Sequence, residues 1–207
     1  MATDAIRDRH ANVVLASGSA TRRAMLEAAG LDVQIDPADV DEAAIRDDVI
    51  AAGGSHSQVA ERLADAKAAV VSARHPGAFV IGGDQVLSFE GRLLEKAASM
   101  SEAREILRSL SGKTHTLYSC ASLARDGEAL WRHVDAAHLT MRAFSDAALD
   151  AYLAKVGDVV LTSVGAYQIE GPAIQLFETV DGAHATILGL PLLPLLGELH
   201  RRRVLVS

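Results

Sequence analysis

Residues 12–35 read NVVLASGSATRRAMLEAAGLDVQI, and this stretch decides the fold class. The apolar, β-branched run at 12–16 is typical of a buried strand. A Ser17-Gly18-Ser19 turn follows, and a helical pattern starts at about Thr21 and stops at a glycine. The run LDVQI at 31–35 then predicts a second strand. A strand, a helix and a strand in close succession indicate an α/β fold.

Strand and helix patterns continue to alternate along the chain, which predicts a sheet flanked by helices. After a polar stretch around 39–48, a helix is expected over residues 57–74, with its apolar face formed by Val59, Leu63, Ala66 and Val70. The other expected elements, in chain order, are a buried strand at 79–83 that runs into Asp84, a hairpin of 85–89 and 92–94, a helix begun by the Ser99–Glu102 capping box, strands at 114–124 and 129–141, a helix at 145–155, a strand at 174–180 and a helix at about 191–202.

Length and composition favour one globular domain. The chain has 207 residues, of which 49% are hydrophobic and 23% charged, so it can bury a substantial core. The first eleven residues mix acids and bases, unlike a secretory signal, and are expected to form a flexible tail. Cys120 is the only cysteine, which excludes an internal disulfide and fits a reducing, cytoplasmic compartment.

Charge and hydropathy exclude two classes of partner. The net charge of −7 argues against sequence-independent binding to nucleic acid, which requires a basic surface. The longest apolar runs fall far short of the ~20 residues of a transmembrane helix, so no membrane partner is expected. A small anionic ligand remains compatible with this charge if basic residues gather locally.

The Ser-Gly-Ser turn and the helix after it form a candidate phosphate site. Arg22 and Arg23 fall in the first helical turn, where cations oppose the helix dipole at a cost of roughly 0.3 to 1 kcal/mol each. A bound anion would reverse that cost, and the turn offers hydroxyls and backbone N–H groups to a phosphate. Two arginines that simply point into solvent are an equally good interpretation of these residues alone.

Asp84 is the strongest single candidate for chemistry. It follows a buried strand and two glycines, and ligands of open α/β sheets bind at the carboxyl ends of strands. Glu42 lies in an acidic run and could bind Mg²⁺ or Mn²⁺ together with Asp84. The competing interpretation of Asp84 is an aspartate that caps a turn. The competing interpretation of Glu42 is a residue of an acidic loop in water. Lys67 and Lys96, taken singly, are better explained as solvated lysines.

Several familiar motifs are absent. The segment 111–114, Ser-Gly-Lys-Thr, resembles the end of a phosphate-binding P-loop, but Leu107 replaces its first glycine and a helix precedes it. The eight histidines have no zinc-ligand spacing, and neither a nucleophile elbow nor a dinucleotide-binding glycine motif occurs. Cys120 lies in an apolar strand, where packing is a commoner role than nucleophilic attack.

Eight short segments, considered together, resemble the Maf family of nucleoside triphosphate pyrophosphatases, first named for septum inhibition. In chain order they are LASGSATRRAMLEAAG, DVDE, ADAKA, IGGDQV, GRLLEK, LSGKTH, SVGAYQIEG and ILGLPL. The resemblance covers nearly the whole chain, from about residue 12 to 200. The resemblance implies an elongated, two-lobed α/β domain over residues 12–203. Its mixed sheet and helices would surround a central groove, as in the related inosine triphosphate pyrophosphatases. A homodimer, and a need for Mg²⁺ or Mn²⁺, are also implied.

The resemblance also implies roles for individual residues. Asp84 matches the catalytic acid that accepts a proton. The segment that grips phosphate is matched by Ser17, Ser19, Arg22 and Arg23, although Ala20 replaces a usual proline. Further groove residues are matched by Glu42, Lys67 and Lys96. Ala97 stands where a proline normally follows the lysine at position 96. The implied reaction is hydrolysis of a nucleoside triphosphate to the monophosphate and pyrophosphate.

Base preference stays open at this point. Arg22, Gln85 and Glu170 match positions associated with base selection, and the last two resemble the branch that acts on 7-methyl-GTP. The Gly165-Ala166-Tyr167 segment instead resembles the pyrimidine branch. The segment Gly182-Ala183-His184-Ala185 and the two missing prolines also keep an alternative open, a catalytically weak nucleotide-binding regulator of cell division.

Overall fold

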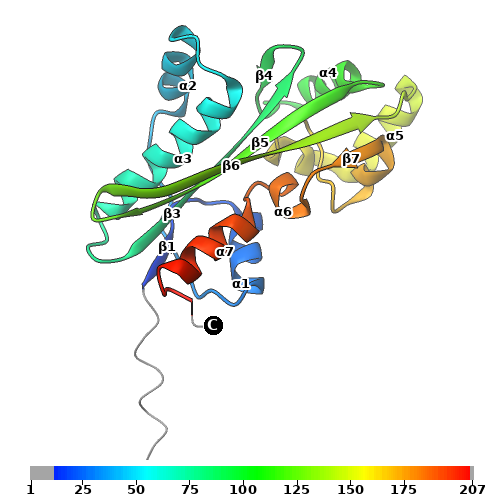
Figure 1. The fold of residues 1–207 in the computed structure, drawn as a ribbon. Coiled ribbons are helices and arrows are strands. Elements are labelled where there is room, and N and C mark those ends of the chain that lie inside the picture. Colours follow the sequence, from blue (N-terminus) through cyan, green and yellow to red (C-terminus); the bar gives the residue numbers. More distant parts are fainter. Residues whose placement is uncertain (1–11, 206–207) are drawn as a thin grey trace, which may run out of the picture. The chain divides into compact units, whose positions relative to one another are not determined.

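The computed structural model describes residues 12–205, which fold into a seven-stranded mixed sheet with helices (Figure 1). The strands are β1 (Val13–Leu15), β2 (Gln34–Ile35), β3 (Phe79–Phe89), β4 (Arg92–Leu94), β5 (Thr114–Arg125), β6 (Glu128–Met141) and β7 (Phe177–Asp181). The helices are α1 (Ala20–Ala28), α2 (Glu42–Ala51), α3 (His56–Ser72), α4 (Met100–Leu110), α5 (Asp146–Val156), α6 (His184–Ile187) and α7 (Leu192–Arg201), with 3-10 helices η1 (Gly157–Thr162) and η2 (Pro172–Leu176). The α/β class is confirmed, and the tail expected at residues 1–11 lies outside the described residues.

The strand order is β2–β1–β3–β5–β6–β7, with β4 paired to β3. The contacts divide the chain into two compact units. Unit 1 contains the described residues of Met1–Asp84, Cys120–Val134 and Gly189–Ser207, and unit 2 contains Gln85–Ser119 and Asp135–Leu188. Each unit has its own hydrophobic core. The single two-lobed domain with a central groove stays a prediction.

Unit 1 begins with the strand–turn–helix–strand that the sequence predicts. β1 pairs in parallel with β2 and with the first residues of β3, where Leu15 lies opposite Ile81. α1 starts at the N-cap Ser19 and is followed by Gly30, which has a φ of 84°. α3 lies on one face of these strands, and α1 and α7 lie on the other (Figure 1).

The buried face of α3 differs from the predicted one. Val59 and Leu63 are buried, but Val70 is 41% exposed. Ala64 and Lys67 point to the sheet instead. The apolar pattern misplaced this face because small alanines, which carry little hydrophobic signal, allow the helix to approach the strand backbone closely.

Two further expectations are corrected. Asp84 does not close its strand, because β3 continues as one extended segment to Phe89. Its neighbour β1 ends earlier, at Leu15, so Asp84 lies three residues beyond the last residue that β1 pairs, Ile81. The polar stretch at 39–48, for which the sequence predicted no element, is helical for most of its length. It forms most of α2, whose N-cap Asp41 accepts a hydrogen bond from a backbone N–H group.

Unit 2 is built on the predicted hairpins and capped helices. β3 and β4 pair antiparallel through a turn in which Glu90 and Gly91 both have positive φ, as the type I′ turn of a two-residue hairpin requires. The N-cap residue of α4 is Ser99, and that of α5 is Ser145. These helices cover a core that contains Leu107 and Leu149, both fully buried.

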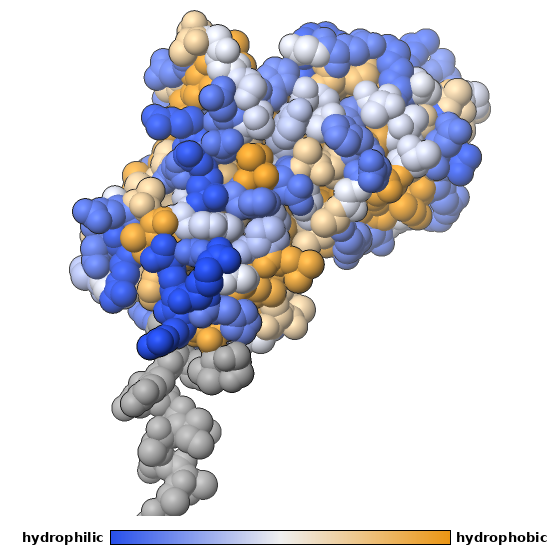
Figure 2. Space-filling view, viewed as in Figure 1, coloured by the Kyte–Doolittle hydropathy of each residue, from blue (hydrophilic) through white to orange (hydrophobic). Residues whose placement is uncertain are grey.

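The surface seen in Figure 2 is largely hydrophilic, with apolar side chains in small groups. The most exposed large apolar side chain among the described residues is that of Leu193, at 78%. No helix within residues 12–205 has both the length and the apolar character required to cross a bilayer.

Candidate active site

The turn after β1 anchors one arginine of the candidate phosphate site. Ser17 Oγ accepts hydrogen bonds from Ser19 N at 3.3 Å and from Arg22 Nη1 at 3.1 Å. Ser19 Oγ accepts one from Arg22 N at 3.3 Å, which caps the helix. Arg22 Nε donates to the carbonyl oxygen of Gly189, 2.8 Å away. The guanidinium is therefore held in one orientation from two distant stretches of the chain.

The two adjacent arginines have different surroundings. Arg22 crosses over Gly83 of β3, where a Cβ would lie 3.2 Å from Arg22 Cδ. Burial lowers the pKa of Arg22, while Asp84 and Glu42 act in the opposite direction. Arg23 instead pairs with Glu27 at 2.7 Å on the exposed side of α1. The interpretation of both arginines as solvent-facing thus fits Arg23 only.

Lys67 joins the two carboxylates that the sequence singles out. Its Nζ lies 2.6 Å from Asp84 Oδ1 and 2.8 Å from Glu42 Oε1. Lys67 and Asp84 are 8% and 6% exposed, so Lys67 is not a solvated lysine. Alternation along β3 explains the meeting, because Gly82 and Asp84 face α3 whereas Gly83 faces Arg22.

Asp84 has the electrostatics of a proton acceptor. Burial raises its pKa above the ordinary range, against the opposing effects of Lys67 and Arg22. A carboxylate with a raised pKa is a stronger base, and a catalytic base works best when its pKa approaches the working pH. The two cations keep the charged form accessible inside the protein.

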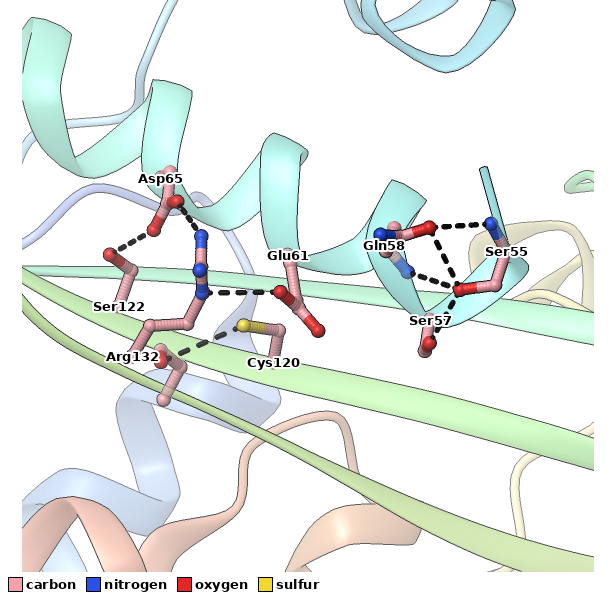
Figure 3. Close-up of polar contacts among 9 residues, drawn as sticks. Ser55, Ser57, Gln58, Glu61, Asp65, Cys120, Ser122 and Arg132 are labelled. Carbon is pink, nitrogen blue, oxygen red and sulfur yellow. Dashed lines mark hydrogen bonds and ion pairs between the residues drawn. The ribbon is translucent and has the colours of Figure 1, made fainter. Parts of the chain in front are cut away.

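A second polar cluster, formed by Arg132 with Glu61, Asp65 and Ser122, fastens α3 to the sheet (Figure 3). Arg132 of β6 pairs with Asp65 and, at 3.2 Å, with Glu61. Ser122 Oγ of β5 donates to Asp65 Oδ1 at 2.7 Å. Asp65 lies two residues before Lys67, so these bonds also fix the helical turn that carries the site lysine. Cys120, next to this cluster, is fully buried, and burial raises the pKa of its thiol, as expected for a packing role.

Unit 2 holds Gln85 in a fixed orientation. Gln85 Nε2 donates to Ser119 Oγ at 2.9 Å and to the carbonyl oxygens of Thr186 and Ile187 at 3.1 and 3.0 Å. Ser119 Oγ donates its own hydrogen to the Thr186 carbonyl. Reversal of the amide would direct Oε1 at two carbonyl oxygens. Gln85 therefore offers a ligand a hydrogen-bond acceptor.

The remaining predicted residues of unit 2 are exposed. Lys96 forms a backbone bridge with Val164. Glu170 Oε1 lies 3.7 Å from Nε2 of His184, the first residue of α6. The segment that carries Glu170 is anchored by Tyr167, which is 5% exposed. Lys96, Gln85 and Glu170 thus belong to unit 2, whereas the phosphate, metal and catalytic candidates other than Lys96 belong to unit 1.

The profile of one protein family, described as Maf-like protein, matches residues 12–202. The chain belongs to the Maf-like family. Curated relatives of this Maf-like protein match over most of its length. A 7-methyl-GTP pyrophosphatase from Brucella abortus is 50% identical over 92% of this chain and 96% of its own. One from Mesorhizobium japonicum is 54% identical over 90% and 94%. A nucleoside triphosphate pyrophosphatase from Paramagnetospirillum magneticum is 49% identical over 93% and 100%.

Sequence reasoning missed the residues of this Maf-like protein that position the site through backbone atoms. The Gly189 carbonyl orients Arg22, and the Thr186 carbonyl orients Gln85. Ser119, fully buried in a strand, also went unnoticed. The family segments at 182–185 and 187–192 pointed to this region, but not to these atoms, because a carbonyl role leaves no trace in side-chain chemistry.

Proposed function

We propose that this protein hydrolyses nucleoside triphosphates to the monophosphate and pyrophosphate, with 7-methyl-GTP as the preferred substrate. The observation that carries the proposal is the cluster of Arg22, Lys67 and Asp84 in unit 1. It combines two fixed cations with one buried carboxylate of raised pKa beside the turn after β1. Relatives about 50% identical over most of the chain have names that describe this activity.

The cations would bind the triphosphate. Arg22 has no hydrogen-bond partner for Nη2 among residues 12–205, so this nitrogen is available to a phosphate oxygen. Ser17, Ser19 and the first N–H groups of α1 lie beside it. Arg23, and Lys96 of unit 2, are further cations that the resemblance to the Maf family assigns to substrate binding. Interactions of this kind stabilise the charge that develops on the departing pyrophosphate.

A divalent ion fits the donor set of unit 1. The positive charges of Arg22 and Lys67 are balanced by the negative charges of Asp84 and Glu42, so the cluster alone cannot neutralise a triphosphate. Mg²⁺ is commonly held by one or two carboxylates together with substrate phosphates. We therefore expect Glu42 and Asp84 to hold Mg²⁺ or Mn²⁺, which when bound supplies Lewis-acid polarisation of phosphate oxygens. Among the described residues no group of three or more His, Cys, Asp or Glu is arranged for a metal.

In the proposed reaction, a water oxygen attacks the α-phosphorus in line with the bond to the β-phosphate oxygen. Asp84 accepts the proton of the attacking water. The electron pair of the broken P–O bond stays on pyrophosphate, whose charge faces Arg22 and Lys67. Burial of Asp84 supports this role, since an exposed aspartate would be a weaker base at neutral pH.

The base preference rests on Gln85 and Glu170 in unit 2. Glu170 is a carboxylate, and the fixed amide of Gln85 presents its oxygen, so both side chains accept hydrogen bonds. Guanine carries adjacent N1–H and amino donors, whereas uracil and thymine flank one N–H with two carbonyls. The positive charge of 7-methylguanine would further favour its binding next to the carboxylate of Glu170.

A cytoplasmic location and a homodimer stay predictions from the sequence.

The test is incubation of the purified protein with a nucleotide panel and Mg²⁺, with pyrophosphate and orthophosphate measured separately. We expect pyrophosphate, released fastest from 7-methyl-GTP. Orthophosphate would indicate a phosphatase. Nucleotide binding without product would indicate the regulatory alternative.

Asp84→Asn is the decisive variant for the mechanism. It should fold and bind nucleotide but lose roughly 10²- to 10⁴-fold in kcat, because the amide cannot accept the proton. The exposed Asp150→Asn, which removes only a surface partner of Arg104, serves as the matched control. Wild-type turnover by Asp84→Asn would overturn the assignment of the base.

A further inference from the structure

Lys67 is held as a cation between two carboxylates that come from different elements. Glu42 is the first residue of α2, and Asp84 lies inside β3. Each places one oxygen within 2.8 Å of the same nitrogen, Lys67 Nζ. The Glu42 side chain is 58% exposed, whereas those of Lys67 and Asp84 are 10% and 9% exposed. One side of this ion cluster therefore faces solvent.

The same two carboxylates are the residues proposed above to hold the divalent ion. An ammonium group and a metal ion cannot share them at close range, because both are positive and both use the same oxygen lone pairs. In the protein alone, the lysine already occupies one oxygen of each carboxylate, Glu42 Oε1 and Asp84 Oδ1. The described residues offer no third acid that would compensate a metal ion for this competition.

We propose that Lys67 occupies the cation position between Glu42 and Asp84 until nucleotide arrives, so that the site takes the metal–nucleotide chelate rather than the free metal ion. This inference rests on the proposed function. The triphosphate supplies the oxygen ligands that the protein lacks, and it gives the lysine a new anionic partner. Lys67 has a flexible four-carbon stem, so its ammonium can change partners while the helix stays in place. Nucleotide and metal then strengthen each other's binding by the same factor.

The direct test is a titration of the nucleotide-free protein with Mn²⁺ alone. Electron paramagnetic resonance measures the concentration of unbound Mn²⁺ at each step. We expect wild-type protein to bind Mn²⁺ weakly, with a dissociation constant in the millimolar range or above. Tight, micromolar binding of Mn²⁺ to the wild-type protein in the absence of nucleotide would overturn the inference. This arm requires no variant.

Lys67→Met removes the competing charge and should tighten Mn²⁺ binding by at least about tenfold. Lys67→Arg keeps a cation between the carboxylates and should bind Mn²⁺ as weakly as wild type. Lys113→Met is the matched control, because Lys113 pairs with the single exposed carboxylate of Glu90. Unchanged affinity in a folded Lys67→Met, or equal tightening in Lys67→Arg, would contradict the inference. Pyrophosphate release is measured separately, so failure here leaves the proposed function standing.

Discussion

Gly82 of β3 lies directly against the backbone of α3, at Ala64. A Cβ built at Gly82 would stand 2.1 Å from the Ala64 carbonyl oxygen, and 2.9 Å from the backbone nitrogen of Ala68. No side chain can move aside to relieve such a contact, because both atoms belong to the backbone. This close approach brings the helix near enough for Lys67 to reach Asp84.

We therefore expect Gly82→Ala to displace α3 and to separate Lys67 from Asp84. Overpacking of this kind costs roughly 1–3 kcal/mol or more, and pyrophosphate release should fall with it. Urea unfolding and the nucleotide assay measure the two effects. Gly197→Ala is the control, since a Cβ there meets nothing within 4 Å and its helix should gain about 0.5–1 kcal/mol. Wild-type stability of Gly82→Ala would show that the helix can shift freely.

Gly83 presents the opposite case, on the other face of the same strand. A Cβ there would lie 3.2 Å from Arg22 Cδ and Nε, which belong to a side chain that can adjust by a few tenths of an ångström. Gly83→Ala should therefore fold normally but shift Arg22, which is proposed both to bind the triphosphate and to face the departing pyrophosphate, so we expect kcat/KM to fall several-fold. Steady-state kinetics measure this. An unchanged kcat/KM would contradict the role given to Arg22.

The apolar pattern predicted most elements because the pattern of each strand or helix lies within its own short stretch of sequence. The capped helices at Ser99 and Ser145 begin where the sequence places them. α2 was missed because its short, acidic sequence shows no apolar periodicity, and its start depends on the Asp41 cap. The end of β3 was misplaced because Gly82 and Gly83 look like a strand terminus when their packing partners, α3 for Gly82 and Arg22 for Gly83, are unknown.

The site was only partly predictable, for a different reason. Asp84 could be singled out by its position after a buried run, but Lys67 looked solvated, because its partners are 17 residues away at Asp84 and still further at Glu42. A buried lysine is recognised only when its carboxylates are known. The resemblance to the Maf family supplied that grouping, and the structure supplies the contacts within unit 1.

The attachment of α3 by Arg132 can be measured with a double-mutant cycle. Arg132→Gln and Asp65→Asn each break the pair, whose side chains are 43% and 20% exposed. Partial exposure limits the coupling to about 1 kcal/mol, and added salt should weaken it. Urea unfolding of the four proteins at low and high salt gives the value. Strict additivity of the two single changes would mean that the ion pair contributes nothing to stability.

We expect His115 to make unit 2 sensitive to acid. Its ring is 2% exposed, Nε2 lies 2.7 Å from the Tyr167 hydroxyl, and Nδ1 has no hydrogen-bond partner among the described residues. Burial lowers the pKa of His115 from 6.5 to about 4. The folded state therefore disfavours the proton relative to the unfolded chain. The contribution of His115 to the free energy of unfolding is fully present above pH 6.5 and is lost as the pH falls towards 4. The total loss is roughly 3 kcal/mol.

Urea unfolding at pH 7.5 and pH 4.5 tests this expectation. His115→Gln cannot be protonated, so it should lose less stability between the two pH values than wild type, even if it is less stable at both. His138→Gln is the matched control, because His138 is an exposed histidine whose Nδ1 bonds to Thr116. It should keep the wild-type difference. Because Tyr167 anchors the segment that carries Glu170, the same acidification should also weaken base discrimination, which competition between 7-methyl-GTP and UTP would report. An unchanged acid sensitivity of His115→Gln would assign the effect to other groups.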